Sequence, residues 1–116
     1  MASADTLLAS KPALLRCKRE EITIKCFDGP LKIKAWRLGD FACHLGRRDY
    51  FGVWVITHLG TGFQCSSAGV FRDEDDAAEA MEQIADLDWS DLSEDGRRKL
   101  GPQVKRIFAE NNAIKG

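Results

Sequence analysis

Apolar and polar residues alternate in short runs between residues 21 and 71, which is the pattern of strands with one buried face. In the first run, Ile22, Ile24 and Cys26 fall on one face. The Asp28-Gly29-Pro30 segment then predicts a hairpin turn, because Asp and Gly tolerate positive φ. Further strands are predicted at 31–38, 41–45, 50–58 and 63–66, with the aromatic and β-branched run 50–58 at the centre.

The spacing of apolar residues lengthens to three and four residues after Asp73, which predicts an amphipathic helix ending at about Leu87. Asp73 is a suitable N-cap, and the acids that follow it lie where the helix dipole favours negative charge. The residues of the apolar stripe are Ala77, Ala80, Met81, Ile84 and Leu87.

A second helical region is predicted near the C-terminus. Ser93 starts a short helical turn, and Gly101-Pro102 is expected to interrupt it, since proline lacks the amide proton that a helix interior requires. Pro102 suits the first position of a last helix, whose buried side contains Val104, Ile107 and Phe108.

These elements predict one α+β domain at residues 21–116: an antiparallel sheet of about four or five strands, with the acidic amphipathic helix on one face and the C-terminal helix beside it. Residues 1–20 are expected to form a flexible arm or a short lead-in helix. A chain of 116 residues with 44% hydrophobic residues is large enough for one core.

No apolar run approaches the roughly 20 residues that span a bilayer, and residues 1–11 lack the pattern of a signal peptide. We therefore expect a cytoplasmic protein with no membrane contact. The four cysteines occur singly, which indicates free thiols rather than a disulfide framework or zinc site.

Candidate catalytic chemistry is sparse. Cys43 and His44 are adjacent on a predicted strand and so point to opposite faces, which excludes a shared metal site in regular geometry. His58 ends a strand without a partner at a useful spacing, and Gly60-Thr61-Gly62 lacks the length and the lysine of a phosphate loop. We expect no enzyme activity, no metal and no cofactor.

Charge is strongly sorted along the chain. The segment from Arg72 to Asp95 carries eleven carboxylates and one basic residue, whereas the rest of the chain carries 16 basic and 7 acidic residues. Because the whole chain has a net charge of only −1, this sorting produces an acidic surface and basic flanks.

Three interpretations of the acidic helix stay open. Its outer face can be simply solvated, or Arg97, Arg98 and Lys99 can fold back and neutralise it, or it can bind a basic partner. A row of carboxylates at helical spacing resembles the phosphates of a nucleic acid. The candidate partner-binding residues are Asp75, Asp76, Glu79, Glu82, Asp86, Asp88 and Trp89. For Trp89 the alternatives are an exposed interface anchor and a core residue that closes the end of the helix.

A basic and aromatic set offers a different reading, in which one sheet face holds single-stranded nucleic acid. Solvated strand faces with ordinary cross-strand pairs explain the same pattern, and the sequence pI of about 6.1 argues against tight duplex binding. The residues of this set are Lys32, Lys34, Trp36, Arg47, Arg48 and Tyr50.

The run from Trp54 to Gly62, followed by Phe71 and the helix from Asp73, resembles small accessory proteins encoded by phages and other mobile elements. This resemblance implies a protein that acts by binding, for example an inhibitor of host defence nucleases of the anti-CRISPR type. Our first expectation is accordingly a non-catalytic inhibitor of a basic, nucleic-acid-handling complex. A small nucleic-acid-binding regulator is the second expectation, and a homodimer with a structural role is the third.

Overall fold

The computed structural model describes residues 13–26, 29–46 and 52–114. The elements, in chain order, are α2 (Ala13–Arg16), β1 (Lys18–Cys26), β2 (Gly29–Leu38), β3 (Phe41–Leu45), β4 (Trp54–His58), β5 (Phe63–Gln64), the 3-10 turn η2 (Cys65–Ser67), α3 (Glu74–Ala85) and α4 (Glu94–Glu110).

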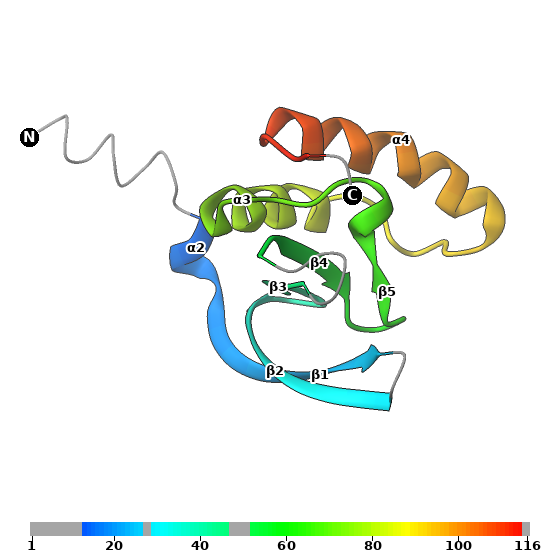
Figure 1. Cartoon of the computed structure of the whole chain (residues 1–116). Coiled ribbons are helices and arrows are strands. Elements are labelled where there is room, and N and C mark those ends of the chain that lie inside the picture. The colour runs from blue at the N-terminus through cyan, green and yellow to red at the C-terminus, as the bar shows by residue number, and fades with distance from the viewer. Residues whose placement is uncertain (1–12, 27–28, 47–51, 115–116) are drawn as a thin grey trace, which may run out of the picture.

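The strands form one antiparallel sheet in the order β1-β2-β3-β4-β5, so each strand pairs with its neighbour in the chain. The helices α3 and α4 lie on one side of this sheet (Figure 1). The predicted α+β class, with an acidic helix packed on an antiparallel sheet, is confirmed. The predicted strand 50–58 is shorter than expected, since β4 begins at Trp54, and β3 occupies the middle of the sheet.

Helix α3 begins where the sequence indicates. The side chain of Asp73 accepts a hydrogen bond from the amide of Asp75 at 2.8 Å, which satisfies one of the unpaired amides of the first turn. The apolar stripe then turns Ala77, Ala80, Met81 and Ile84 toward the sheet, where all four are fully buried.

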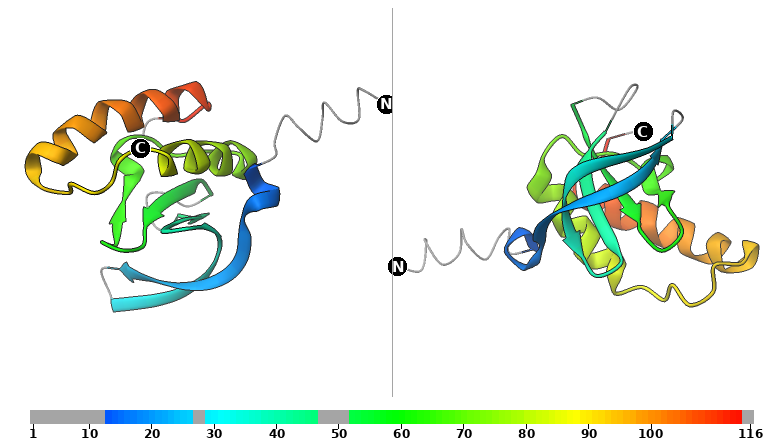
Figure 2. Two further views of the ribbon diagram at one scale, coloured as in Figure 1. Left: turned by 180° about the vertical axis from the view of Figure 1, so that it is seen from behind. Right: turned by 90° about the horizontal axis from the view of Figure 1, so that it is seen from below.

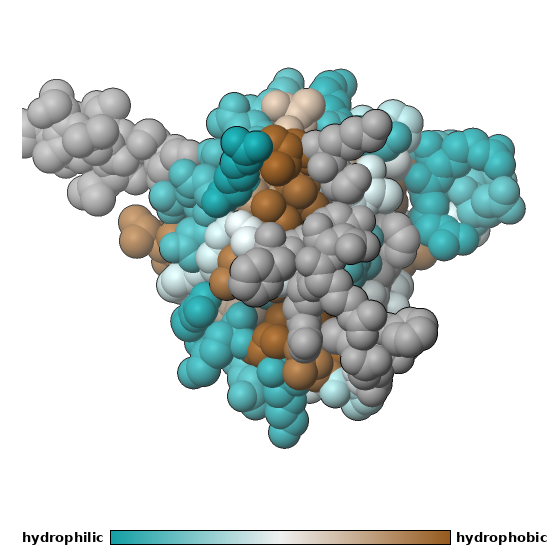
Figure 3. Space-filling view, in the orientation of Figure 1, coloured by the Kyte–Doolittle hydropathy of each residue, from teal (hydrophilic) through white to brown (hydrophobic). Residues whose placement is uncertain are grey.

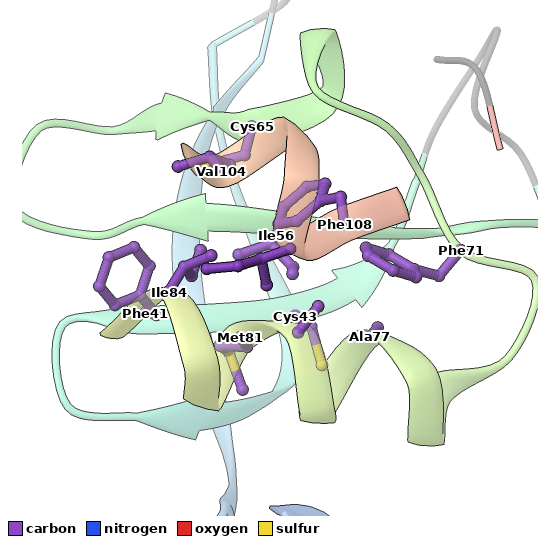
Figure 4. Close-up of a cluster of buried hydrophobic side chains, with 12 residues drawn as sticks. Phe41, Cys43, Ile56, Cys65, Phe71, Ala77, Met81, Ile84, Val104 and Phe108 are labelled. Carbon is purple, nitrogen blue, oxygen red and sulfur yellow. The ribbon is translucent and has the colours of Figure 1, made fainter. Parts of the chain in front are cut away.

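The main core lies between the sheet and the two helices, and Figure 4 shows side chains from both layers meeting there. Ile56 of β4 is fully buried beneath the helices, and Phe71 packs edge-to-face on Phe108 of α4 at 5.0 Å between ring centroids. Burial of such aromatic and aliphatic side chains supplies most of the driving force for this packing.

The other face of the sheet carries a second, smaller core. The hairpin of β1 and β2 bends away from the helices (Figures 1 and 2), and only three residues of β2 pair with β3. Because the sheet curls, Ile22 and Ile24 of β1 share a buried cluster with Ala42 of β3, and Leu59 packs against it from beyond β4. A flat sheet would leave this face exposed to solvent.

Helix α4 differs from the prediction. It is one continuous helix from Glu94 to Glu110, and Gly101-Pro102 does not interrupt it. Leu100 before the proline and Val104 after it are both buried on the same side, so core packing holds the helix together across Pro102. Pro102 is exposed, and because it has no amide proton it cannot donate a helical hydrogen bond to the carbonyl of Arg98.

The boundary placed between residues 20 and 21 falls inside β1, which begins at Lys18 and pairs there with Arg37. Helix α2 also belongs to the packed structure, because Ala13 is 1% exposed and Cys17 contacts the main core. The part of the predicted arm at residues 1–12 lies outside the described residues. No helix among residues 13–26, 29–46 and 52–114 has the length and apolar content needed to cross a membrane.

Candidate functional site

The candidate acidic residues on α3 divide into two groups. Asp75, Asp76, Glu79 and Glu82 are partly buried; Glu82 contacts Arg16 of α2, and Asp76 contacts Asn112 after α4. The guanidinium of Arg16 in α2 forms a two-point ion pair with Glu82, and this hydrogen bonding raises the pKa of Arg16. Glu82 is therefore already matched by a cation of the same chain.

Other carboxylates of α3 also have contacts within the molecule. Glu74 accepts a hydrogen bond from the indole nitrogen of Trp36 at 2.8 Å, and Asp76 accepts one from the side chain of Asn112 at 3.5 Å. One oxygen of Glu79 is buried without a hydrogen-bond partner among the described residues. The first three turns of α3 thus face neighbouring elements more than the solvent.

The second group lies at the end of α3 and in the connector to α4. We call it the acidic connector surface, and it consists of Asp86, Asp88, Asp91, Glu94 and Asp95. All five residues are exposed. The N-terminal part of α4 projects at the right of Figure 3, where the surface is hydrophilic.

Local hydrogen bonds fix the carboxylates of the connector. Asp88 accepts from the amide and the hydroxyl of Ser90 at 2.9 and 2.6 Å, and Asp91 accepts from the amide of Ser93 at 3.0 Å. Hydrogen bonding with the side chain and then the amide of Ser90 lowers the pKa of Asp88, and hydrogen bonding with the side chain and then the amide of Ser93 lowers the pKa of Asp91. The charges are held in place on the surface.

The interpretation in which Arg97, Arg98 and Lys99 neutralise α3 is not what the ion pairs of the described residues show. Arg98 pairs with Glu94 at 3.2 Å and with Asp95 at 3.7 Å, both on its own helix and highly exposed. Arg97 and Lys99 form no ion pair with the carboxylates of α3 in the part of the chain that is described. Asp86 and Asp88 likewise have no ion-pair partner there.

Trp89 is not the exposed anchor that the first of its two interpretations requires. Its indole nitrogen donates to the carbonyl of Ile84 at 2.6 Å, and its ring stacks on His58 and packs edge-on against Phe41. It is partly buried against the main core, because the connector turns back under α3 at this point. These contacts agree with the other interpretation of Trp89, in which it is a core residue that closes the end of the helix.

The basic and aromatic set is brought together only in part. Lys32 and Lys34 are exposed on β2, but Trp36 bonds to Glu74, packs on the main core and lies 5.1 Å from the guanidinium of Arg19. An indole held in this way is a poor platform for stacking a base. Arg47, Arg48 and Tyr50 lie outside the described residues.

His44 and the cysteines Cys43 and Cys65 are buried. Cys43 lies in the main core, and burial raises its pKa, and that of Cys65, to about 12. His44 points to the other face, bonds to Thr57 at 2.9 Å and to the carbonyl of Leu45 at 3.1 Å, and burial lowers its pKa. Within residues 13–26, 29–46 and 52–114, no three His, Cys, Asp or Glu side chains could hold a metal ion.

Sequence reasoning missed two features of this region. The ion pair between Arg16 and Glu82 joins residues 66 positions apart, and no local pattern indicates such a contact. A cleft between the end of β4 and α4 was also missed, because His58, Cys65 and Val104 are far apart in the sequence. The acidic residues Asp91, Glu94 and Asp95 were visible as part of the charged segment, although the prediction emphasised α3.

The sequence matches no protein-family model, and neither curated proteins nor solved structures provide a significant match to the chain. Function has to be argued from the residues of the site themselves.

Proposed function

We propose that this protein is a non-catalytic binding protein that docks through the acidic connector surface onto a basic, nucleic-acid-handling protein. The observation that carries the proposal is the exposure of Asp86 and Asp88, with no ion-pair partner among the described residues, at the end of a strongly acidic helix. Surfaces with one sign of charge steer and orient partners of the opposite sign.

The position of Asp86 supports a role outside the fold. It is the C-cap residue of α3, whose last turn has no basic residue, and the negative end of the helix dipole disfavours a carboxylate there. Among the described residues no cation forms an ion pair with Asp86. A cationic partner would offset the unfavourable interaction with the dipole, whereas the isolated chain gains nothing from this charge.

The partner that fits such a surface normally binds phosphates. Fixed carboxylates at Asp88 and Asp91 present negative charge in a defined arrangement, as a nucleic-acid backbone does, and a basic groove accommodates either. Competition for that groove would make the protein an inhibitor of the anti-CRISPR or anti-defence type. The free thiols of Cys43 and Cys65 fit the reducing cytoplasm, where such a partner works.

Affinity capture from a cell extract, with quantitative identification of the bound proteins, tests this proposal. The bait is compared with Asp86→Asn/Asp88→Asn, which removes two charges but keeps the oxygen acceptors. Glu21→Gln/Glu110→Gln is the matched control, since it removes two exposed charges at remote positions. We expect a basic nucleic-acid-binding protein to be retained by the wild type and the control, and reduced at least about tenfold with the acidic variant, because close interfacial charge pairs are worth more than about 1.4 kcal/mol.

Retention that also falls steeply with added salt would agree with charge-driven docking. Equal retention by the wild type and Asp86→Asn/Asp88→Asn would refute the role of this surface. Capture of nucleic acid itself, with no protein dependent on Asp86 and Asp88, would favour the regulator that uses the basic strand face.

A further inference from the structure

A cleft of about 470 Å³ opens between the end of β4 and helix α4. Its floor and walls are mostly apolar and come from three separate stretches of the chain. Cys65 and Ala68 contribute from η2 and its cap, Trp89 from the connector, and Leu100 and Val104 from α4. The volume lies within the range of roughly 300–1,000 Å³ that small-molecule sites occupy.

The imidazole ring of His58, which lines this cleft, has a hydrogen-bond partner at only one of its two nitrogens among the described residues. His58 is only 8% exposed, and its Nδ1 lies 2.9 Å from the hydroxyl of Thr61. Its Nε2 has no hydrogen-bond partner among the described residues, and this atom is not sealed from solvent. This nitrogen is therefore accessible for a hydrogen bond with a polar atom of a bound ligand, as donor or acceptor according to the tautomer.

The imidazole of His58 and the indole of Trp89 form an aromatic wall of the cleft. His58 stacks on Trp89 with ring centroids 5.4 Å apart and planes 11° from parallel, so the two rings share one orientation beside the cleft. Phe41 packs edge-on against both rings, at 5.0 and 4.9 Å between centroids, and fixes them from behind. An aromatic ligand suits a cleft that is lined by aromatic rings, because aromatic groups pack favourably on one another edge-on or with offset stacking.

The charge at the rim is positive, in contrast to the neighbouring connector. Arg97 and Lys105 of α4 line the cleft, are exposed, and have no ion-pair partner in the part of the chain that is described. No carboxylate lines the cleft among the described residues. Two unpaired cations beside an apolar floor favour an anion that carries an apolar body.

We propose that this cleft binds a small planar aromatic molecule that carries one anionic group, a carboxylate or a phosphate. The apolar body lies between the Trp89–His58 wall and the side chains of α4. The anionic group lies at the rim against Arg97 and Lys105, and a polar atom of the ligand completes His58 Nε2. This site is separate from the acidic connector surface and does not depend on the function proposed above.

The test uses 2-naphthoate as the probe and its neutral amide, 2-naphthamide, as the matched comparison. The full chain is labelled with ¹⁵N and titrated with each compound while amide and indole shifts are followed by NMR. We expect saturable shifts centred on His58, Trp89 and Val104, with a dissociation constant of about 1 mM or tighter for a probe of this size. The amide should bind about fivefold more weakly, as expected for the loss of exposed charge pairs.

Charge variants on α4 locate the anion. Arg97→Gln/Lys105→Gln should bind the acid no better than the amide. Arg98→Gln/Arg106→Gln removes two cations from the same helix that do not line the cleft, and it should keep the preference for the acid. All four positions are exposed, so both variants should fold as the wild type does.

Two results would overturn the proposal. Shifts that do not saturate, or that centre away from the cleft, would show that the cleft is not a ligand site. Equal binding of acid and amide would show an apolar pocket without anion preference, as expected for a socket that receives an apolar side chain of another protein.

Discussion

At the residue scale, two carboxylates of the α3 region have partners at very different separations along the chain: Asp73 accepts from the amide of Asp75, and Glu82 pairs with Arg16, 66 residues away. Asp73 could be assigned as a helix cap because the cap and the amide that it satisfies are two residues apart. The partner of Glu82 could not be assigned, because Arg16 is 66 residues away in the sequence and the two residues meet only through the tertiary fold. The two possible environments of Trp89 could be separated only by the structure, because a tryptophan beside acids suits either one.

Asp75 and Asp86 lie at opposite ends of α3, so removing their charges should change the stability of the protein in opposite directions. Asp86→Asn should raise the free energy of unfolding by about 0.3–1 kcal/mol, because it removes a carboxylate from the negative end of the helix dipole. Asp75→Asn should lower it by a similar amount, since Asp75 lies in the first turn, where the dipole favours the charge. Urea unfolding at low ionic strength measures both. A loss of stability in Asp86→Asn would mean that Asp86 is matched within the chain.

His44 predicts a pH dependence of stability. Burial lowers its pKa in the folded state, so the unfolded chain binds the proton more tightly than the folded one. Its contribution is complete above about pH 6.5 and is lost as the pH falls toward the folded-state pKa, at up to about 1.4 kcal/mol per pH unit.

Urea unfolding of the wild type and His44→Gln between about pH 7.5 and 5 checks this, because the other titrating groups are common to both proteins. The difference in unfolding free energy should shrink as the pH falls. A difference that is constant with pH would contradict the linkage to His44.

At the element scale, periodicity predicted which helices and strands exist better than where they end. The stripe of α3 was identified from its spacing, and the alternation of residues 31–38 predicted most of β2. The prediction that Pro102 interrupts the helix was wrong. The burial of Leu100 and Val104, which keeps α4 continuous, depends on the tertiary fold and is not visible in the local sequence.

Gly96 shows how the connector is held against α4. A Cβ at this position would lie 2.0 Å from the backbone carbonyl oxygen of Asp91, so only glycine allows this close approach. Gly96→Ala should therefore lower the free energy of unfolding by about 1–3 kcal/mol, although alanine is the better helix former.

Gly101→Ala is the comparison on the same helix, since its added Cβ meets no atom within 4 Å apart from its chain neighbours and the helix's own backbone. Its stability should change much less than that of Gly96→Ala, as measured by thermal or urea unfolding. A neutral or stabilising effect of Gly96→Ala would show that the connector moves freely away from α4.

At the scale of the whole molecule, the sorting of charge along the chain was apparent from the sequence, but which acidic side chains are exposed to solvent depends on the fold. Part of the acidic segment is turned inward along α3, with Glu82 paired to Arg16, while the connector carries Asp86, Asp88 and Asp91 to the surface. The curl of the sheet, which buries Ile24 and Ala42 on the face opposite the helices, could not be predicted from alternation alone, because it depends on where β2 leaves β3. The cleft beside His58 arises in the same way, from chain segments that meet only in the folded protein.

The proposed docking depends on negative potential at Asp86 and Asp88, which are exposed and have no ion-pair partner among the described residues. Paramagnetic relaxation of backbone amides by a cationic nitroxide and by its neutral analogue measures this potential directly. We expect the cationic probe to relax the amides of residues 86–91 more than the neutral probe does. The difference should shrink as added salt reduces the Debye length from about 10 Å at 0.1 M to about 3 Å at 1 M. Equal relaxation of these amides by the two probes would contradict the presence of this negative potential.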